Sequence, residues 1–389
     1  MPNSKFPILW SKINAKNNNL VFLVILSVIF IRPFICALAF PYLNLVYSLT
    51  LLIFLAAHVT CRKLTLTKTG IFVFPFILFL FALFLSVIFS QDKSNSFTQL
   101  YQYLIGLGLF LVAASLSEKE KLLTIQTIIL AGLIISLLAI YQYFFGFQHV
   151  QDYLSTHNFS TPFILDYLQS KRVFYPFLTP SALGGYLAMI LLLSLTNKNR
   201  IWFILLIFPA FLLTQSPSAF LSLLCALIIY FRVQGKLKKT NILLLAGLFL
   251  LIVFMLIGRS ANQKWHLHPA FSAVMRLNYW QESWSLIKAH PFVGIGLGNF
   301  NLQNSRYAHN TYLQIWAETG ILGLFSLVWI IVVALNSCLK NLSQSLYKRE
   351  IAGLLAAIVA FLAHNFIDFT FYLPEISLIW WVILGLAIL

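Results

Sequence analysis

The chain has 389 residues, of which 60% are hydrophobic and only 9% are charged. An ordinary soluble domain carries about 25% charged residues, so this composition excludes a soluble enzyme, a disordered protein and a small secreted disulfide scaffold. The solid apolar runs also differ from the alternating strands of an outer-membrane barrel. The net charge of +16 does not indicate nucleic acid, because the basic residues lie in segments between apolar runs, as in the cytoplasmic loops of membrane proteins.

The apolar runs predict an all-α, polytopic membrane bundle of about 12 transmembrane helices. One span needs about 20 mostly apolar residues, so twelve spans use most of the apolar residues of this chain. The first run is interrupted at Arg32-Pro33, which predicts an apolar core that ends at Ile31. In chain order the predicted spans are Leu20–Ala39, Tyr42–His58, Ile71–Phe89, Leu100–Ala114, Leu122–Phe145, Ser181–Leu195, Asn199–Thr214, Ser218–Val233, Ile242–Ile257, Gly320–Leu339, Ile351–Phe371 and Leu373–Leu389.

The distribution of Lys and Arg predicts the orientation of these spans. With the N-terminus in the cytoplasm, 17 of the 26 basic residues fall in inner segments, although those segments are short. The positive-inside rule therefore places both termini in the cytoplasm of a bacterial inner membrane protein.

Two long segments fall on the opposite, periplasmic side, at residues 146–180 and 258–319. Long ordered loops in compact proteins usually carry function. With no internal repeat or low-complexity tract, the chain is predicted to form a single membrane domain, residues 1–389, with a helical periplasmic cap.

Two arginines in these segments are candidates for binding phosphate. Arg172 precedes a helix predicted to begin near Pro180, and Arg276 flanks an apolar stripe on a predicted surface helix, Val274–Lys288. A guanidinium group offers two parallel hydrogen bonds to a phosphate. The alternative is that both are ordinary loop arginines whose side chains reach the membrane interface.

A second candidate region begins at His309-Asn310 and leads into a span. Thr311, Gln314 and Glu318 share one helix face and carry polar groups toward the membrane, where such residues line a cavity or pair with another helix. A histidine at this boundary, titrating near pH ~6.5 when unperturbed, can act as a general base. The alternative is that His309-Asn310 only caps the helix.

Other patterns are weaker indications of function. The glycine-rich stretch Gly294–Gly298 follows no predicted strand and is interpreted as a turn. His364 and Asp368 have helical spacing and are predicted to pair as a structural tie. No Asp-x-Asp motif occurs, so the usual ligands of a metal-dependent sugar-nucleotide transferase are absent, and we expect no metal and no cofactor.

Three stretches together resemble the O-antigen ligase/polymerase superfamily of bacterial membrane proteins, from about Gln142 to the C-terminus. These stretches are Arg172 with Pro176–Gly184, Arg276–Trp280 with His290–Phe300, and His309–Gln314 with Glu318–Gly323. The segment Thr214–Ser218 departs from the Thr-x-Ser-Arg-Gly pattern of many relatives, since Pro217 stands in place of the arginine.

The resemblance implies a C-type glycosyltransferase that moves a glycan from an undecaprenyl diphosphate carrier to an acceptor such as lipid A-core, in lipopolysaccharide or polysaccharide biosynthesis. It implies that Arg172 and Arg276 bind the diphosphate and that His309 assists the acceptor hydroxyl. We expect the other polar and aromatic side chains of the two motifs to support them, namely Trp280, Tyr312, Gln314 and Glu318.

The sequence leaves other activities open. A polysaccharide polymerase or a protein O-oligosaccharyltransferase would use the same donor, and the acceptor cannot be identified from one chain. A solute transporter or flippase is a further alternative. That class favours charged residues deep in several spans and a repeat across two halves, neither of which the sequence contains.

Overall fold

The computed structural model describes residues 20–62, 70–157, 168–235, 238–260, 269–303, 305–344 and 347–388. Throughout these ranges the regular elements are helices, with no strand, which confirms the predicted all-α class. Residues 20–31 form the first helix. The helices that follow are α2 (Pro41–Arg62), α3 (Val73–Phe89), α4 (Lys93–Ser115), α5 (Glu118–Tyr141), α6 (Phe147–His157), α8 (Pro180–Ser194), α9 (Arg200–Leu213), α10 (Pro217–Val233), α11 (Lys239–Ser260), α12 (Pro269–Ala289), α13 (Thr311–Gln344), α14 (Lys348–His364) and α15 (Pro374–Leu386), with short elements η1 (Arg32–Phe34), η2 (Gly70–Phe72), η3 (Gln142–Gly146) and η5 (Thr370–Tyr372).

Several of these helices can cross a membrane. In the described part of the chain, five are long and apolar enough to do so, and six shorter apolar helices have 10–17 residues. The five are Gly70–Phe89, Lys93–Ser115, Glu118–Thr156, Lys239–Ser260 and Thr311–Leu342. The number of about 12 spans, which also counts the shorter helices, stays a prediction.

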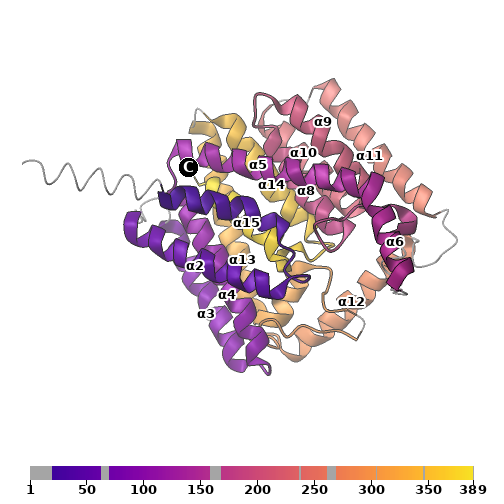
Figure 1. Ribbon diagram of the computed structural model, residues 1–389. Helices are drawn as coiled ribbons and strands as arrows, with labels where there is room; N and C mark the ends of the chain where they lie inside the picture. The colour runs from indigo at the N-terminus through magenta and orange to yellow at the C-terminus, as the bar shows by residue number, and fades with distance from the viewer. Residues whose placement is uncertain are drawn as a thin grey trace, which may run out of the picture.

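The helices α8, α14 and α15 form the centre of the bundle. Figure 1 shows α2, α3 and α4 on one side, α9, α10 and α11 on the other, and α14 and α15 between them. The described residues of α15 are all buried, and so is almost the whole of α8, as expected for helices that are apolar on every face. By contrast, α11 buries only Leu248 and Ile252, so most of its apolar surface is free to face lipid.

Contacts at the ends of helices divide the bundle into two ends. At one end Lys121 Nζ donates to the Ile388 carbonyl at 2.7 Å, and Arg349 donates to the Leu195 and Asn197 carbonyls, both at 2.8 Å. Lys121, Asn197 and Arg349 are predicted to be cytoplasmic, and Leu195 and Ile388 lie at the predicted cytoplasmic ends of their spans. Loops predicted to be periplasmic meet one another at the opposite end, as described below. The grouping agrees with the predicted topology, and which end faces the periplasm stays a prediction.

Two predicted helix starts and stops are confirmed. The first helix ends at residue 31, where Pro33 cannot continue its hydrogen bonding. Helix α8 begins at Pro180, and the Thr179 side chain accepts a hydrogen bond from the Ala182 backbone at 3.1 Å. This cap fixes the end of the loop that carries Arg172.

The two long segments contain more helix than the sequence indicated. The segment 146–180 begins with α6, which continues from α5 through η3. The segment 258–319 holds the predicted surface helix as α12, and its last residues already belong to α13, which begins at Thr311 and kinks at Gly320. The predicted span start at Gly320 coincides with this kink, where two helical segments meet, and the polar groups before it are satisfied within the protein.

Arg32, where the first predicted span is interrupted, is buried in the fold. Its Nη2 atom donates to Asn44 Oδ1 at 2.8 Å and lies 3.5 Å from Glu375 Oε2, while the guanidinium covers the Tyr47 ring at 4.9 Å. A buried charge requires such partners. The contacts tie the first helical hairpin to α15.

Candidate functional site

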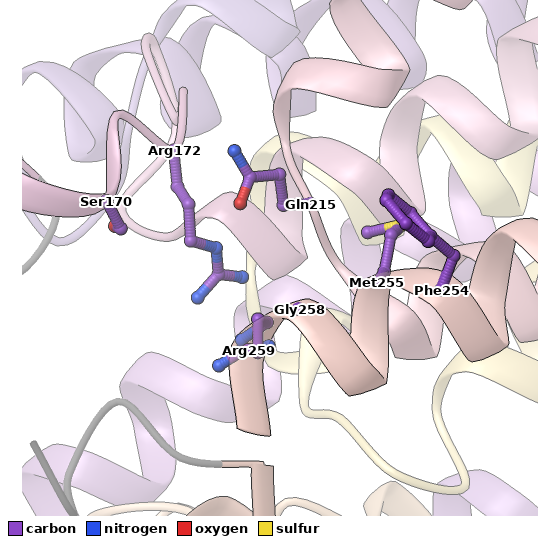
Figure 2. Close-up of a pocket in the computed structure, with 7 residues that line it drawn as sticks. All are labelled: Ser170, Arg172, Gln215, Phe254, Met255, Gly258 and Arg259. Atoms are coloured by element: carbon purple, nitrogen blue, oxygen red, sulfur yellow. The ribbon is translucent and has the colours of Figure 1, made fainter. Parts of the chain in front are cut away.

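Two arginines line one pocket at the end of the bundle that is predicted to be periplasmic. The pocket has a volume of about 360 Å³, and Arg172 and Arg259 reach it from different elements. Figure 2 shows both guanidinium groups directed to the same space, with Gln215 beside them. Arg172 comes from the loop before α8, where its Nε donates to the Thr214 carbonyl at 3.2 Å.

The pocket combines positive charge with an apolar wall. Arg259 lies at the C-terminal end of α11, and Phe254 and Met255 line the pocket from the preceding turn of that helix. Such a wall suits a lipid tail, and guanidinium groups suit phosphate oxygens. No sequence pattern singled out Arg259, because it stands at the end of a predicted span, as many anchoring arginines do.

Arg276 is held in place by the protein. From α12, its Nε donates to the Ile367 carbonyl at 3.0 Å, and its Nη1 donates to the Ser272 carbonyl and hydroxyl at 3.3 and 2.5 Å. Its charge also acts on Arg259, which places the two arginines within electrostatic reach of each other. Arg259 thus links the Arg172 pocket to Arg276.

A hydrogen-bonded polar cluster connects the start of α8, the residue before α10 and the segment that follows α14. Ser181 Oγ donates to Asp368 Oδ2, and Ser216 Oγ lies 3.3 Å from Ser181 Oγ. His364 Nε2 lies 3.5 Å from the same Asp368 oxygen, so the predicted pairing of these two residues is confirmed. Asp368 follows the end of α14 and precedes η5, which makes this pair a tie between a helix end and a loop.

His309 lies in an aromatic setting beside Arg276. Its ring stacks on Tyr279 with 5.7 Å between centroids and meets Phe369 edge-on at 4.8 Å. Its Nδ1 atom is buried without a hydrogen-bond partner in the described chain. Burial lowers the pKa of His309 to about 4, with the Asp368 carboxylate opposing this shift and the Arg276 charge adding to it. The ring is therefore neutral at pH 7.

The helix cap next to His309 is made by its neighbour. Asn310 Oδ1 accepts hydrogen bonds from the Tyr312 and Leu313 backbone at 3.0 and 3.1 Å, which is the N-cap arrangement. The capping alternative for the His309-Asn310 pair thus applies to Asn310 alone. The His309 side chain is left without a capping role.

Strained backbone is concentrated around these residues. Lys171, Gln215 and His309 are the non-glycine residues with positive φ in the described ranges, at 48°, 46° and 50°. Each costs of order 1–3 kcal/mol, and such strain tends to be kept at functional sites. Lys171 precedes Arg172, and Gln215 follows the carbonyl that holds Arg172, so the strain helps to aim the candidate side chains.

Gln314 and Glu318 belong to a hydrogen-bond network with the glycine-rich stretch. Gln314 Nε2 donates to Glu318 Oε1 at 2.9 Å, and the Gly298 backbone donates to Glu318 Oε2 at 3.1 Å. The Ile295 and Gly296 backbones donate to carbonyls of α13 at 2.8 and 3.2 Å. The polar face of α13 thus pairs with a loop rather than lining a cavity, and the stretch forms the predicted turn, with positive φ at its three glycines.

The two aromatic candidates have different surroundings. Tyr312 donates from its hydroxyl to the Leu362 carbonyl at 3.0 Å, which ties α13 to α14. Trp280 lies on α12, and its buried Nε1 has no hydrogen-bond partner in the described chain. Neither side chain lines the pocket of Arg172 and Arg259.

A comparison with protein families finds a similarity over part of the chain. The family model described as O-antigen ligase matches residues 202–328. This match supports the resemblance to the O-antigen ligase superfamily that the sequence motifs indicated. The matched region, about a third of the chain, includes Arg259, Arg276 and His309, while Arg172 precedes it. No curated protein matches the chain.

Proposed function

We propose that the chain is an O-antigen ligase-like glycosyltransferase that moves a glycan from undecaprenyl diphosphate to an acceptor such as lipid A-core, on the periplasmic face of the bacterial inner membrane. The observation that carries the proposal is the grouping of Arg172, Arg259 and Arg276 next to a neutral histidine. This grouping fits a leaving group that is anionic and an acceptor that must lose a proton.

In the proposed reaction, an acceptor hydroxyl gives its proton to His309 while its oxygen attacks the anomeric carbon of the donor sugar. The bond from that carbon to the diphosphate oxygen breaks, and undecaprenyl diphosphate leaves with the electron pair. Arg172 and Arg276 stabilise the charge that develops on it, as fixed donors do most effectively in a site of low dielectric. Arg259 adds a third positive charge at the same place.

The pocket also accounts for the lipid part of the donor. Phe254 and Met255 lie beside the arginines on a helix whose surface is largely exposed, so a polyprenyl chain can lie along α11 while its diphosphate enters the pocket. In this arrangement membrane lipid is a partner of the protein.

A transfer assay tests the function. The purified protein in vesicles is mixed with its lipid-linked glycan donor and, in separate reactions, with lipid A-core, with a second glycan on the carrier, or with a glycosylation-competent protein. Product on lipid A-core supports the ligase. Product only on the carrier or on protein indicates the polymerase or the protein O-oligosaccharyltransferase instead.

Charge-preserving variants test the diphosphate contacts in the same assay. Arg172→Lys and Arg276→Lys keep the positive charge but lose the bidentate fork, so we expect a rate at least about tenfold lower for each. Arg200→Lys, at the opposite end of the bundle, is the control. Unchanged rates in both site variants would contradict the proposed diphosphate contacts.

A further inference from the structure

A second pocket lies on the side of α3 and α4. It has a volume of about 540 Å³ and is lined by the turn between these helices and by the loop that follows the glycine-rich stretch. The lining side chains include Gln91, Asp92, Asn95, Asn299, Asn301 and Arg306. The function described above assigns no role to this pocket.

Hydrogen bonds within the protein hold the two segments that line the pocket against each other. Ser96 Oγ donates to the Leu297 carbonyl at 2.6 Å, and Asn299 Nδ2 donates to Ser90 Oγ. Gly298 has φ +71°, and a Cβ atom there would come within 2.9 Å of the Asn95 carbonyl oxygen, so only glycine allows this approach. Glu318 also stabilises this turn, because its carboxylate accepts a hydrogen bond from the Gly298 backbone.

The chemistry of the lining differs from that of the arginine pocket. Planar amides and one carboxylate offer paired donors and acceptors, which match the neighbouring hydroxyls of a sugar ring. Asn299 Oδ1 is buried and lacks a hydrogen-bond partner in the described ranges. Gln91 and Asn301 have exposed side chains. Arg306 is the cation among the lining residues, so this wall does not suit a lipid diphosphate.

The chain connects this pocket to His309. Arg306 and His309 are three residues apart, so their Cα atoms lie within about 11 Å of each other. Between them Tyr307 stacks on Phe369 with 4.2 Å between centroids, and His309 contacts the same ring. The pocket therefore includes a residue whose Cα atom lies within about 11 Å of that of the proposed base.

We propose that this pocket is a carbohydrate subsite that binds a sugar residue of the glycan being transferred or of the acceptor. The proposal rests on the proposed function for its choice of glycans. In this subsite, sugar hydroxyls contact the lining amide side chains, which are those of Gln91, Asn95, Asn299 and Asn301. Arg306 adds a hydrogen-bond donor at the edge nearest His309.

Binding of carrier-free sugars tests the subsite without requiring turnover. The full-length protein in detergent is titrated, with saturation-transfer NMR as the readout, with two probes: the oligosaccharide released from the carrier by mild acid, and the core oligosaccharide released from lipopolysaccharide. We expect one of them to bind, and the probe that binds identifies the donor glycan or the acceptor as the source.

Matched variants locate the binding. Gln91→Ala and Asn301→Ala each remove an exposed amide, so the fold should be kept, and we expect binding roughly 2- to 10-fold weaker for each. Gln303→Ala removes an exposed amide of the same loop that does not line the pocket and should bind as the unmodified protein does.

Equal binding by all three variants, or no binding of either oligosaccharide to the unmodified protein, would overturn the subsite. Failure of the proposed function gives a different result. In that case no transfer occurs in the vesicle assay, whatever the binding of free oligosaccharide shows.

Discussion

At the residue scale, His309 is the side chain with the clearest expected effect. General-base loss lowers a rate by about 10²–10⁴. Because Asn310 makes the helix cap, we expect His309→Ala and His309→Asn to fold normally and both to lose transfer to this extent in the vesicle assay. His149→Ala, on α6, removes an exposed histidine as a control. Near-normal transfer by the Asn variant would mean that another group activates the acceptor.

The burial of His309 also changes the expected pH dependence. The sequence suggested a fall in rate near the ordinary histidine pKa of ~6.5. The base is active when neutral, and burial lowers its pKa to about 4, so kcat/KM should stay level from pH 7 to about 5 and fall through pH 4. A bound diphosphate raises this pKa, so the fall in kcat should come at higher pH. A fall in kcat/KM centred at 6.5 would contradict this assignment.

Arg259 provides a test of the pocket that the sequence did not suggest. A hydrogen bond to a charged group contributes about 1.5–3 kcal/mol, so we expect Arg259→Ala to lower kcat/KM for the lipid-linked donor by about 10- to 100-fold. Lys239→Ala, at the other end of α11, should leave it unchanged. Equal kinetics for the two variants would remove Arg259 from the donor site.

At the element scale, the kink of α13 depends on Gly320. Its φ of 68° and ψ of −176° are accessible to glycine, and a Cβ atom there would lie 1.9 Å from the Phe292 carbonyl oxygen. We expect Gly320→Ala to lower the free energy of unfolding by more than about 1–3 kcal/mol, measured by thermal unfolding in detergent.

A glycine in a straight helix gives the matched control for that substitution. Gly247 lies inside α11, and a Cβ atom added there would have no neighbouring side chain or other helix within 4 Å. Gly247→Ala should therefore be neutral or stabilise the protein by about 0.5–1 kcal/mol. A Gly320 variant as stable as the Gly247 variant would show that the kink tolerates an ordinary residue.

The sequence predicted the helices better than their contacts. Pro180 and Pro33 mark helix ends through their own backbone chemistry, and these ends were predictable. His364–Asp368 was also predictable from its spacing, whereas the loop partner of Glu318 and the serine partner of Asp368 were not, because one lies twenty residues earlier and the other on another helix. Periodicity shows which face of a helix is polar, but the fold decides what that face meets.

At the scale of the whole molecule, the orientation is open to direct measurement. In a protein whose native cysteines are replaced, we introduce Gln303→Cys and, separately, Lys198→Cys, both at exposed positions. The positive-inside rule predicts that an impermeant maleimide labels position 303 in intact cells and position 198 only after lysis. The reverse pattern would invert the topology and place the arginine pocket in the cytoplasm.

Helices α8 and α14 are fastened to each other at both ends. At one end Arg349 holds the carbonyls of Leu195 and Asn197, and at the other Ser181 donates to Asp368. Transporters that work by alternating access rock one part of the bundle against another, so that each end opens in turn. A central helix pair tied at both ends moves as one rigid body. We therefore expect a glycan to be handled and released at a single surface, without being carried through the bundle.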